Sequence, residues 1–153
     1  MKASGRGFTL IELLVVMMII GALLATVPAA FNKAVPGAEL KSAARRVATG
    51  LRAARNAAIS HNQEVALDLN LDARNFTITR PTGRAPVYSL PRNEAIQIKL
   101  FTAETELSEE YQGGAIRFFP DGSSTGGQVS LALNQRKYII DINWLTGRVS
   151  IFD

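Results

Sequence analysis

The sequence contains no cysteine and a single histidine, His61. Without cysteine the chain forms no disulfide, so its core must hold without covalent cross-links. The same counts exclude thiolate and imidazole metal clusters, and we expect neither a metal site nor a cofactor. His61 stands beside Asn62, and nothing in the sequence marks a nucleophile that it could activate. We therefore expect a building block that is not an enzyme.

Formal charge is also absent from residues 13–32, a run of twenty residues. A helix of this length, at about 1.5 Å per residue, measures roughly 30 Å, which is the thickness of the hydrocarbon core of a bilayer. Lys2 and Arg6 precede the run, and positive residues tend to stay on the cytoplasmic side of a membrane. The run predicts a single membrane-spanning helix, with the rest of the chain on the far side of the membrane.

Glu12 lies near the start of this apolar region. A carboxylate inside a membrane segment costs about 2.5 to 3.5 kcal/mol on insertion scales, so it requires a positive partner or a proton. No lysine or arginine lies within helical reach of it inside the segment. Cleavage of the chain after Gly7 would give Phe8 a new α-ammonium group on the same helix face as Glu12. Such a cleavage would supply the missing cation.

The stretch from Gly7 to Glu12, which reads Gly-Phe-Thr-Leu-Ile-Glu, resembles the N-terminal signal of type IV pilins and type II secretion pseudopilins. The resemblance implies that a prepilin peptidase cleaves the bond between Gly7 and Phe8 and methylates the new amine of Phe8. It also implies that Glu12 assists assembly by pairing with the terminal amine of a neighbouring subunit. An ordinary secretory signal cut near Ala29 and a plain membrane anchor are the alternatives, and an anchor leaves Glu12 unexplained.

Helical periodicity returns after two predicted irregularities, a kink near Pro28 and a bend or pause at Pro36. Apolar residues then recur at spacings of three and four, which predicts one buried helix face made of Leu40, Ala44, Val47, Leu51, Ala54 and Ala58. Basic residues fall largely off this face, at Lys41, Arg45, Arg52 and Arg55. We interpret them as a solvated cationic face, with contact to another subunit or to lipid headgroups as the alternative.

Alternating patterns after Asn62 predict strands near residues 65–69, 76–79, 87–90, 96–100, 115–119, 128–133, 138–142 and 148–152. Asp121 and Gly122 are a turn signal, and they predict a hairpin that joins residues 115–119 to residues 128–133. The glycine-rich segment that follows them lacks the lysine of a phosphate-binding loop. Four glutamates within residues 102–112 lack the tight glycine turn of a calcium loop and predict an exposed loop.

The segment 116–127, the paired strands after it and the Thr-Gly-Arg-Val sequence that ends at Val149 resemble minor pseudopilin H of type II secretion systems, the GspH-like family. The resemblance implies a pilin-like α+β fold, with a long N-terminal helix packed on a C-terminal antiparallel β-domain of two sheets. It divides the chain into a leader (1–7), a transmembrane and filament-core helix (8–32), an amphipathic helix (33–62) and a periplasmic β-domain (63–153).

The partners implied by this resemblance are other minor pseudopilins, the major pseudopilin, the prepilin peptidase, the inner-membrane assembly platform and, before extraction, inner-membrane lipid. The alternative is a FimT-like minor pilin that acts in pilus assembly or binds DNA during uptake. Such a pilin would carry a second arginine two places after Arg148, where this sequence has Ser150. The formal charge is +4 and falls to about +2 without Lys2 and Arg6, so we do not expect nucleic acid as a partner.

Overall fold

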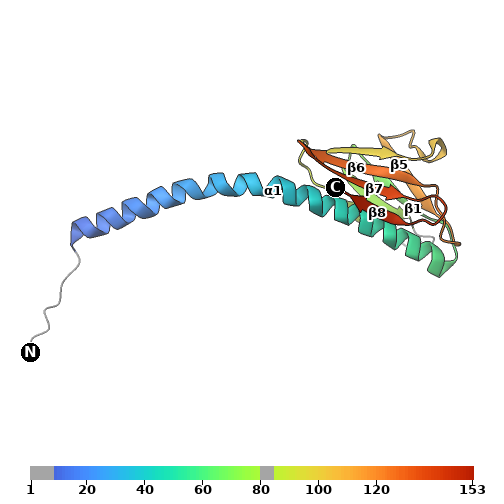
Figure 1. Ribbon diagram of the computed structural model, residues 1–153, viewed down its shortest axis with the longest axis horizontal. Helices are drawn as coiled ribbons and strands as arrows, with labels where there is room; N and C mark the ends of the chain where they lie inside the picture. The colour runs from blue at the N-terminus through green and yellow to red at the C-terminus, as the bar shows by residue number, and fades with distance from the viewer. Residues whose placement is uncertain (1–8, 80–84) are drawn as a thin grey trace, which may run out of the picture. The chain divides into compact units, whose positions relative to one another are not determined.

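The computed structural model describes residues 9–79 and 85–153, with the side chains of residues 24–36 left out of the description. The chain divides into two compact units, Met1–Pro36 and Gly37–Asp153. Its elements are α1 (Leu10–His61), β1 (Val65–Asn70), β2 (Asn75–Thr79), β3 (Val87–Ser89), β4 (Gln97–Phe101), the 3-10 helix η1 (Glu104–Glu106), β5 (Gly113–Phe118), β6 (Gly127–Leu133), β7 (Arg136–Ile142) and β8 (Val149–Phe152). Figure 1 colours the chain from its N-terminus to its C-terminus and labels α1, β1, β5, β6, β7 and β8.

The backbone of α1 is helical from Leu10 to His61 without interruption. The pause predicted at Pro36 is therefore wrong, whereas the bend given as its alternative stays a prediction. A proline removes one backbone donor and costs about 3 kcal/mol inside a helix, but it does not prevent hydrogen bonding in the turns on either side. Pro36 falls where the first unit ends, and residues 37–61 then continue as the helix of the second unit.

In the described part of the second unit, eight strands form two antiparallel sheets. One sheet has the strand order β3-β2-β1-β5, and the other has the order β4-β6-β7-β8. In the first sheet Leu67 lies opposite Ile78 and Ile116, and all three side chains are buried. In the second sheet Ile140 lies opposite Val129, and both are fully buried. The prediction of an α+β chain with two antiparallel sheets is confirmed.

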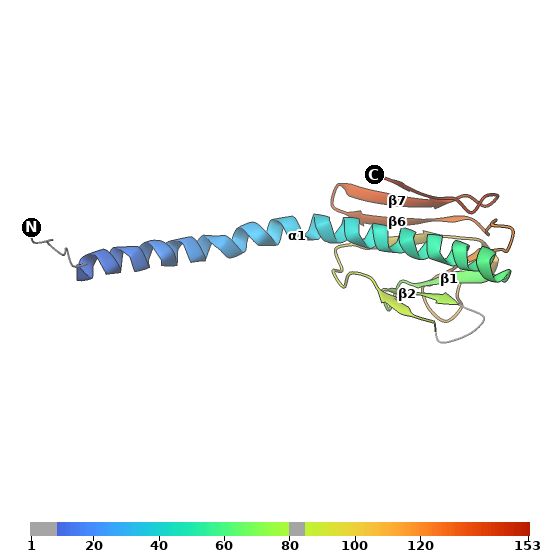
Figure 2. The same cartoon turned by 90° about the horizontal axis from the view of Figure 1, so that it is seen from below.

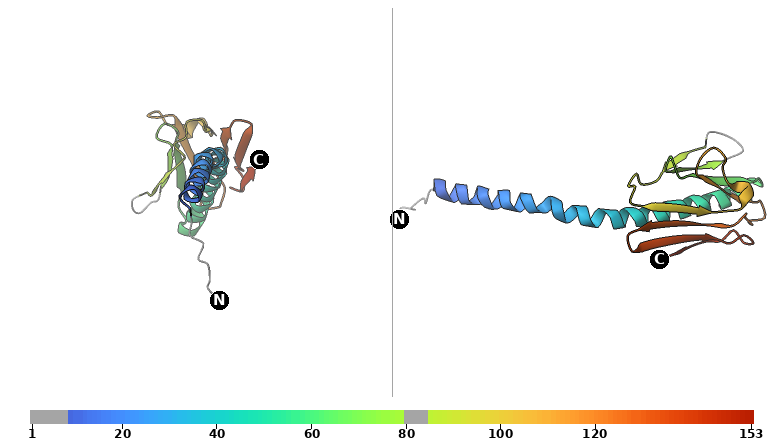
Figure 3. Two further views of the ribbon diagram at one scale, coloured as in Figure 1. Left: turned by 90° about the vertical axis from the view of Figure 1, so that its left-hand side faces the viewer. Right: turned by 90° about the horizontal axis from the view of Figure 1, so that it is seen from above.

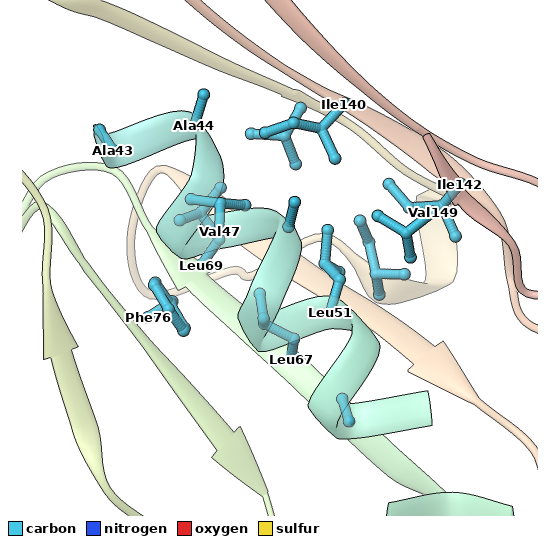
Figure 4. Close-up of a cluster of buried hydrophobic side chains, with 14 of the residues drawn as sticks. Ala43, Ala44, Val47, Leu51, Leu67, Leu69, Phe76, Ile140, Ile142 and Val149 are labelled. Atoms are coloured by element: carbon cyan, nitrogen blue, oxygen red, sulfur yellow. The ribbon is translucent and has the colours of Figure 1, made fainter. Parts of the chain in front are cut away.

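The helix of the second unit lies along the seam between the two sheets, with β6 and β7 on one side and β1 and β2 on the other (Figures 2 and 3). All six residues of the predicted apolar face are buried, none more than 1% exposed. Val47 and Leu51 lie between Phe76 and Leu67 on one side and Ile140 on the other (Figure 4). Burying a side chain of this size stabilises the fold by about 1.5 to 3 kcal/mol. The amphipathic helix thus joins both sheets to one core.

The connection between β5 and β6 is not the predicted hairpin, because the two strands belong to different sheets. Ser124 draws the connection toward the β7–β8 turn: its backbone N–H donates to the carbonyl oxygen of Trp144 at 2.8 Å, and its hydroxyl donates to that of Asn143 at 3.2 Å. Gly126 and Gly127 then adopt positive φ values of 73° and 141°, which suit glycine. The glycine-rich segment therefore carries the chain from one sheet to the other.

Candidate functional site

Three residues were assigned to processing and assembly from the sequence, and the structure describes one of them. Gly7 and Phe8 lie outside the described residues, whereas Glu12 is exposed in the first turn of α1. The backbone N–H of Glu12 donates to the Thr9 hydroxyl oxygen at 3.3 Å, so Thr9 caps the helix. Such a cap contributes about 1 kcal/mol, and an acidic residue in the first turn adds about 0.3 to 1 kcal/mol. Sequence reasoning missed this cap, although Thr-x-x-Glu before an apolar run is its signal.

The first turns of α1 expose an almost continuous apolar surface. Large apolar side chains between 45% and 83% exposed occupy Leu10, Ile11, Leu13, Leu14, Val15, Val16, Met17, Met18, Ile19 and Ile20. A patch of this extent indicates contact with lipid or with other apolar surfaces. Within the described residues, no helix has both the length and the apolarity needed to cross a bilayer. The predicted span includes residues 24–32, whose side chains lie outside the description.

Two arginines on α1 connect the helix to loops of the β-domain. The Arg55 Nε–H donates to the carbonyl oxygens of Gly122 at 3.2 Å and Thr146 at 3.1 Å. One turn earlier, Arg52 Nη2 donates to the carbonyl oxygen of Val149 at 3.1 Å. The interpretation of these two residues as part of a solvated face is therefore incomplete, because their guanidinium groups donate to backbone carbonyls in two loops and at the start of β8.

Other basic residues of α1 differ in their contacts. Arg46 Nη1 donates to the carbonyl oxygen of Ser89 in edge strand β3 at 2.7 Å. Lys41 and Arg45 are exposed, and within the described part of the chain their charged groups form no hydrogen bond or ion pair. The predicted solvated face is thus reduced to these two residues.

A groove of about 820 Å³ runs between α1 and the β7–β8 hairpin. Its lining consists of Arg52, Arg55, Asn56, Asp141, Asn143, Thr146, Gly147, Arg148, Val149 and Ser150. The guanidinium of Arg148 is exposed and has no hydrogen-bond or ion-pair partner among the described residues. Three arginines and one aspartate therefore give the groove a net positive charge. Sequence reasoning did not group these residues, because they lie about ninety positions apart on α1 and at β8.

The acidic segment predicted as an exposed loop contains one exception, Glu106. Its side chain is only 9% exposed and binds Arg117 in a two-pronged ion pair, with Nε–Oε1 at 2.8 Å and Nη2–Oε2 at 3.2 Å. The hydrogen bond to Glu106 is the main cause that raises the pKa of Arg117 above its ordinary value. No group of His, Asp or Glu residues in the described ranges could hold a metal ion. Glu106 therefore has a structural role at the end of η1.

His61 lies exposed at the C-terminal end of α1. Its Nδ1 is 2.9 Å from the carbonyl oxygen of Ala57 and 3.1 Å from the hydroxyl of Ser60. The Ser60 hydroxyl also donates to the carbonyl oxygen of Ala57, at 3.3 Å. Both side chains thus contact the carbonyl oxygen of Ala57 near the C-terminal end of the helix.

Comparison with known proteins agrees with this geometry. Residues 43–146 match the family described as type II transport protein GspH, and residues 2–28 match the prokaryotic N-terminal methylation motif. Type II secretion system protein H of Xanthomonas campestris pv. campestris is 31% identical over 144 residues, which cover 94% of this chain and 81% of that protein.

Two crystal structures of the type IV minor pilin FimU from Pseudomonas aeruginosa resemble the chain in fold. One has a TM-score of 0.60 at 15% identity, and the match covers 77% of this chain and 91% of the chain in that crystal structure. The other has a TM-score of 0.55 at 14% identity and covers 74% and 92%. This likeness establishes a pilin-like fold, and the family match extends over more than half of the chain. The chain therefore belongs to the GspH family, the minor pseudopilins of type II secretion systems.

Proposed function

We propose that this protein is a structural subunit of the periplasmic pseudopilus, in the complex near its tip, and that it serves the export of folded proteins across the outer membrane. The observation that carries the proposal is the presence in one chain of an N-terminal methylation motif (residues 2–28) and a GspH domain (residues 43–146). The role is mechanical, and it requires no catalytic residue. Its partners are the other minor pseudopilins and the major pseudopilin.

Maturation in this proposal begins with the prepilin peptidase, which cuts between Gly7 and Phe8 and methylates the amine of Phe8. The methylation motif and the basic residues Lys2 and Arg6 support this step. The chain first resides in the inner membrane, with one span within residues 8–32, its N-terminus in the cytoplasm and its β-domain in the periplasm. The assembly platform then extracts it into the filament.

Glu12 guides the assembly step in this proposal. Its carboxylate is exposed near the end of the apolar surface of α1, where it is available to a second subunit. When the apolar helices of many subunits pack together, a buried carboxylate becomes strongly destabilising unless a cation pairs with it. The methylated amine of Phe8 on a neighbouring subunit provides that cation. Pairing between Glu12 and Phe8 would then set the axial register of adjacent subunits.

Replacing Glu12 with alanine tests the proposal. Glu12→Ala keeps the backbone N–H that the Thr9 hydroxyl accepts, so the start of α1 is preserved. We expect normal processing and membrane insertion, together with loss of incorporation into the pseudopilus and loss of export. Glu39→Ala, on the same helix, is the control and should export normally. Full export by cells that carry Glu12→Ala would contradict the assigned role.

A further inference from the structure

The turn between β7 and β8 presents two large apolar side chains to solvent. Trp144 is 66% exposed and Leu145 is 62% exposed. The turn that carries them is held by Asn143, whose side-chain oxygen accepts the backbone N–H groups of Leu145 at 3.1 Å and Thr146 at 2.9 Å and the Thr146 hydroxyl at 3.0 Å. The N–H of Gly147 also donates to the Asn143 carbonyl oxygen at 2.8 Å. The two side chains are thus exposed on a well-ordered turn.

This turn adjoins the groove between α1 and the β7–β8 hairpin, which we call the arginine groove because Arg52, Arg55 and Arg148 line it. Asn143, Thr146 and Gly147 line the groove, and Arg55 binds the Thr146 carbonyl oxygen from the other wall. Arg148 follows the turn directly, and its five guanidinium donors have no partner among the described residues. An exposed tryptophan beside unpaired arginine is the composition typical of binding hot spots in protein interfaces.

We propose that Trp144, Leu145 and the arginine groove form one docking surface, the Trp–Arg surface, for a neighbouring pseudopilus subunit that presents carboxylates beside an apolar side chain. The proposal rests on the function proposed above, because it takes the neighbour to be another subunit. Charge complementarity favours a segment of the partner that carries carboxylates, since guanidinium groups bind carboxylates through paired hydrogen bonds. The partner's apolar side chain packs on Trp144 and Leu145.

Nucleic acid fits the same surface less well. Asp141 lines the groove, and its carboxylate would repel a phosphate backbone. Leu145 offers an aliphatic surface on which bases do not stack as they do on aromatic rings. The Arg52 and Arg55 guanidiniums already donate to backbone carbonyls, so Arg148 is the arginine of the groove with all its donors available. A protein segment with one or two carboxylates matches this arrangement.

Photo-cross-linking in cells with a working secretion system tests the proposal. A benzophenone amino acid replaces Leu145 in the full-length chain, and mass spectrometry identifies the cross-linked peptide. We expect a peptide of another pseudopilus subunit that contains aspartate or glutamate. The same probe at Lys137, which is exposed at the opposite end of β7, should not give this product. Cross-links at Leu145 to nucleic acid, lipid or secreted cargo, or no product beyond that at Lys137, would overturn the proposal.

Substitutions in the probe-carrying chain then test the two chemical components. Trp144→Ala and Arg148→Glu should each lower the cross-link yield on the order of tenfold. The matched controls are Phe152→Ala, a 56% exposed aromatic at the other end of β8, and Lys137→Glu, which makes the same charge reversal. Changing the partner's carboxylate to arginine should restore the yield with Arg148→Glu. Equal cross-link yields from the variants and their controls would overturn the proposal that the Trp–Arg surface binds the neighbouring subunit. If the wild-type chain is still processed and supports export, the proposed function would be unaffected.

Discussion

Arg55 connects α1 to two loops of the β-domain through a single Nε–H group. The substitution Arg55→Ala removes the hydrogen bonds to the carbonyl oxygens of Gly122 (3.2 Å) and Thr146 (3.1 Å). The acceptor Gly122 follows Asp121 and the acceptor Thr146 precedes Gly147, so both acceptors lie far from α1 in sequence. The Arg55 contact is therefore a long-range link that joins the helix to both the β5–β6 connection and the β7–β8 turn.

The expected loss of stability follows from the geometry of this link. A hydrogen bond from a charged donor contributes about 1.5 to 3 kcal/mol. Because one N–H is shared between two carbonyl oxygens and Arg55 is only half-buried, we take the lower part of this range and expect a loss of about 2 kcal/mol. For a chain of this size the melting temperature should fall by roughly 4 to 8 °C.

Urea and thermal unfolding of the full chain in detergent, followed by near-ultraviolet circular dichroism, would measure this loss. The matched control is Arg45→Ala on the same helix, because the Arg45 side chain is exposed and its guanidinium has no hydrogen bond or ion pair within the described ranges. It should change the free energy of unfolding by less than about 0.5 kcal/mol. If Arg55→Ala and Arg45→Ala destabilise the chain equally, the link is not a source of stability and the reasoning fails.

Two further predictions concern the β-domain. Gly147 has a φ of 60°, and a Cβ added to it would lie too close to the Gly122 carbonyl oxygen. Gly147→Ala should therefore lower the free energy of unfolding, measured in urea, by about 2 kcal/mol or more. An unchanged midpoint of urea unfolding would contradict this. Burial, together with the 2.5 Å hydrogen bond to Asp68, raises the pKa of Tyr111 above its ordinary value of 10.0. The contribution of the protonated Tyr111 hydroxyl to stability is therefore complete below pH 10 and is lost as the pH rises through the folded-state pKa. A tyrosinate absorbance titration in which Tyr111 ionises at or below its ordinary pKa would refute this.

Local patterns in the sequence predicted much of the second unit. The spacing of Leu40, Val47 and Leu51 placed the buried face of α1 correctly, because a helix buried against one core must keep its apolar residues on one side. Alternation identified the strands, including the short β3. The Trp-Leu-Thr-Gly segment was placed as the connection between β7 and β8 because it lies between two alternating segments. These features depend on neighbours within a few residues, which is the range that periodicity reports.

Features that depend on distant residues were not predicted. The Asp121-Gly122 turn signal does not reveal which sheet the following strand joins, and the hydrogen bonds of Ser124 to the β7–β8 turn decide it. The groove likewise combines Arg52 with Arg148, residues that a linear pattern cannot pair. Of the processing residues, only Glu12 lies in the described part of the chain, and its role in assembly stays a prediction.

The mass of the N-terminal peptide of the mature protein tests the central claim most directly. The protein would be isolated from membranes of cells that contain the prepilin peptidase and digested for mass spectrometry. A processed pseudopilin predicts a peptide that begins at Phe8 and carries one methyl group on its amine. A mature chain that begins at Met1, or one cut near Ala30, would contradict the account.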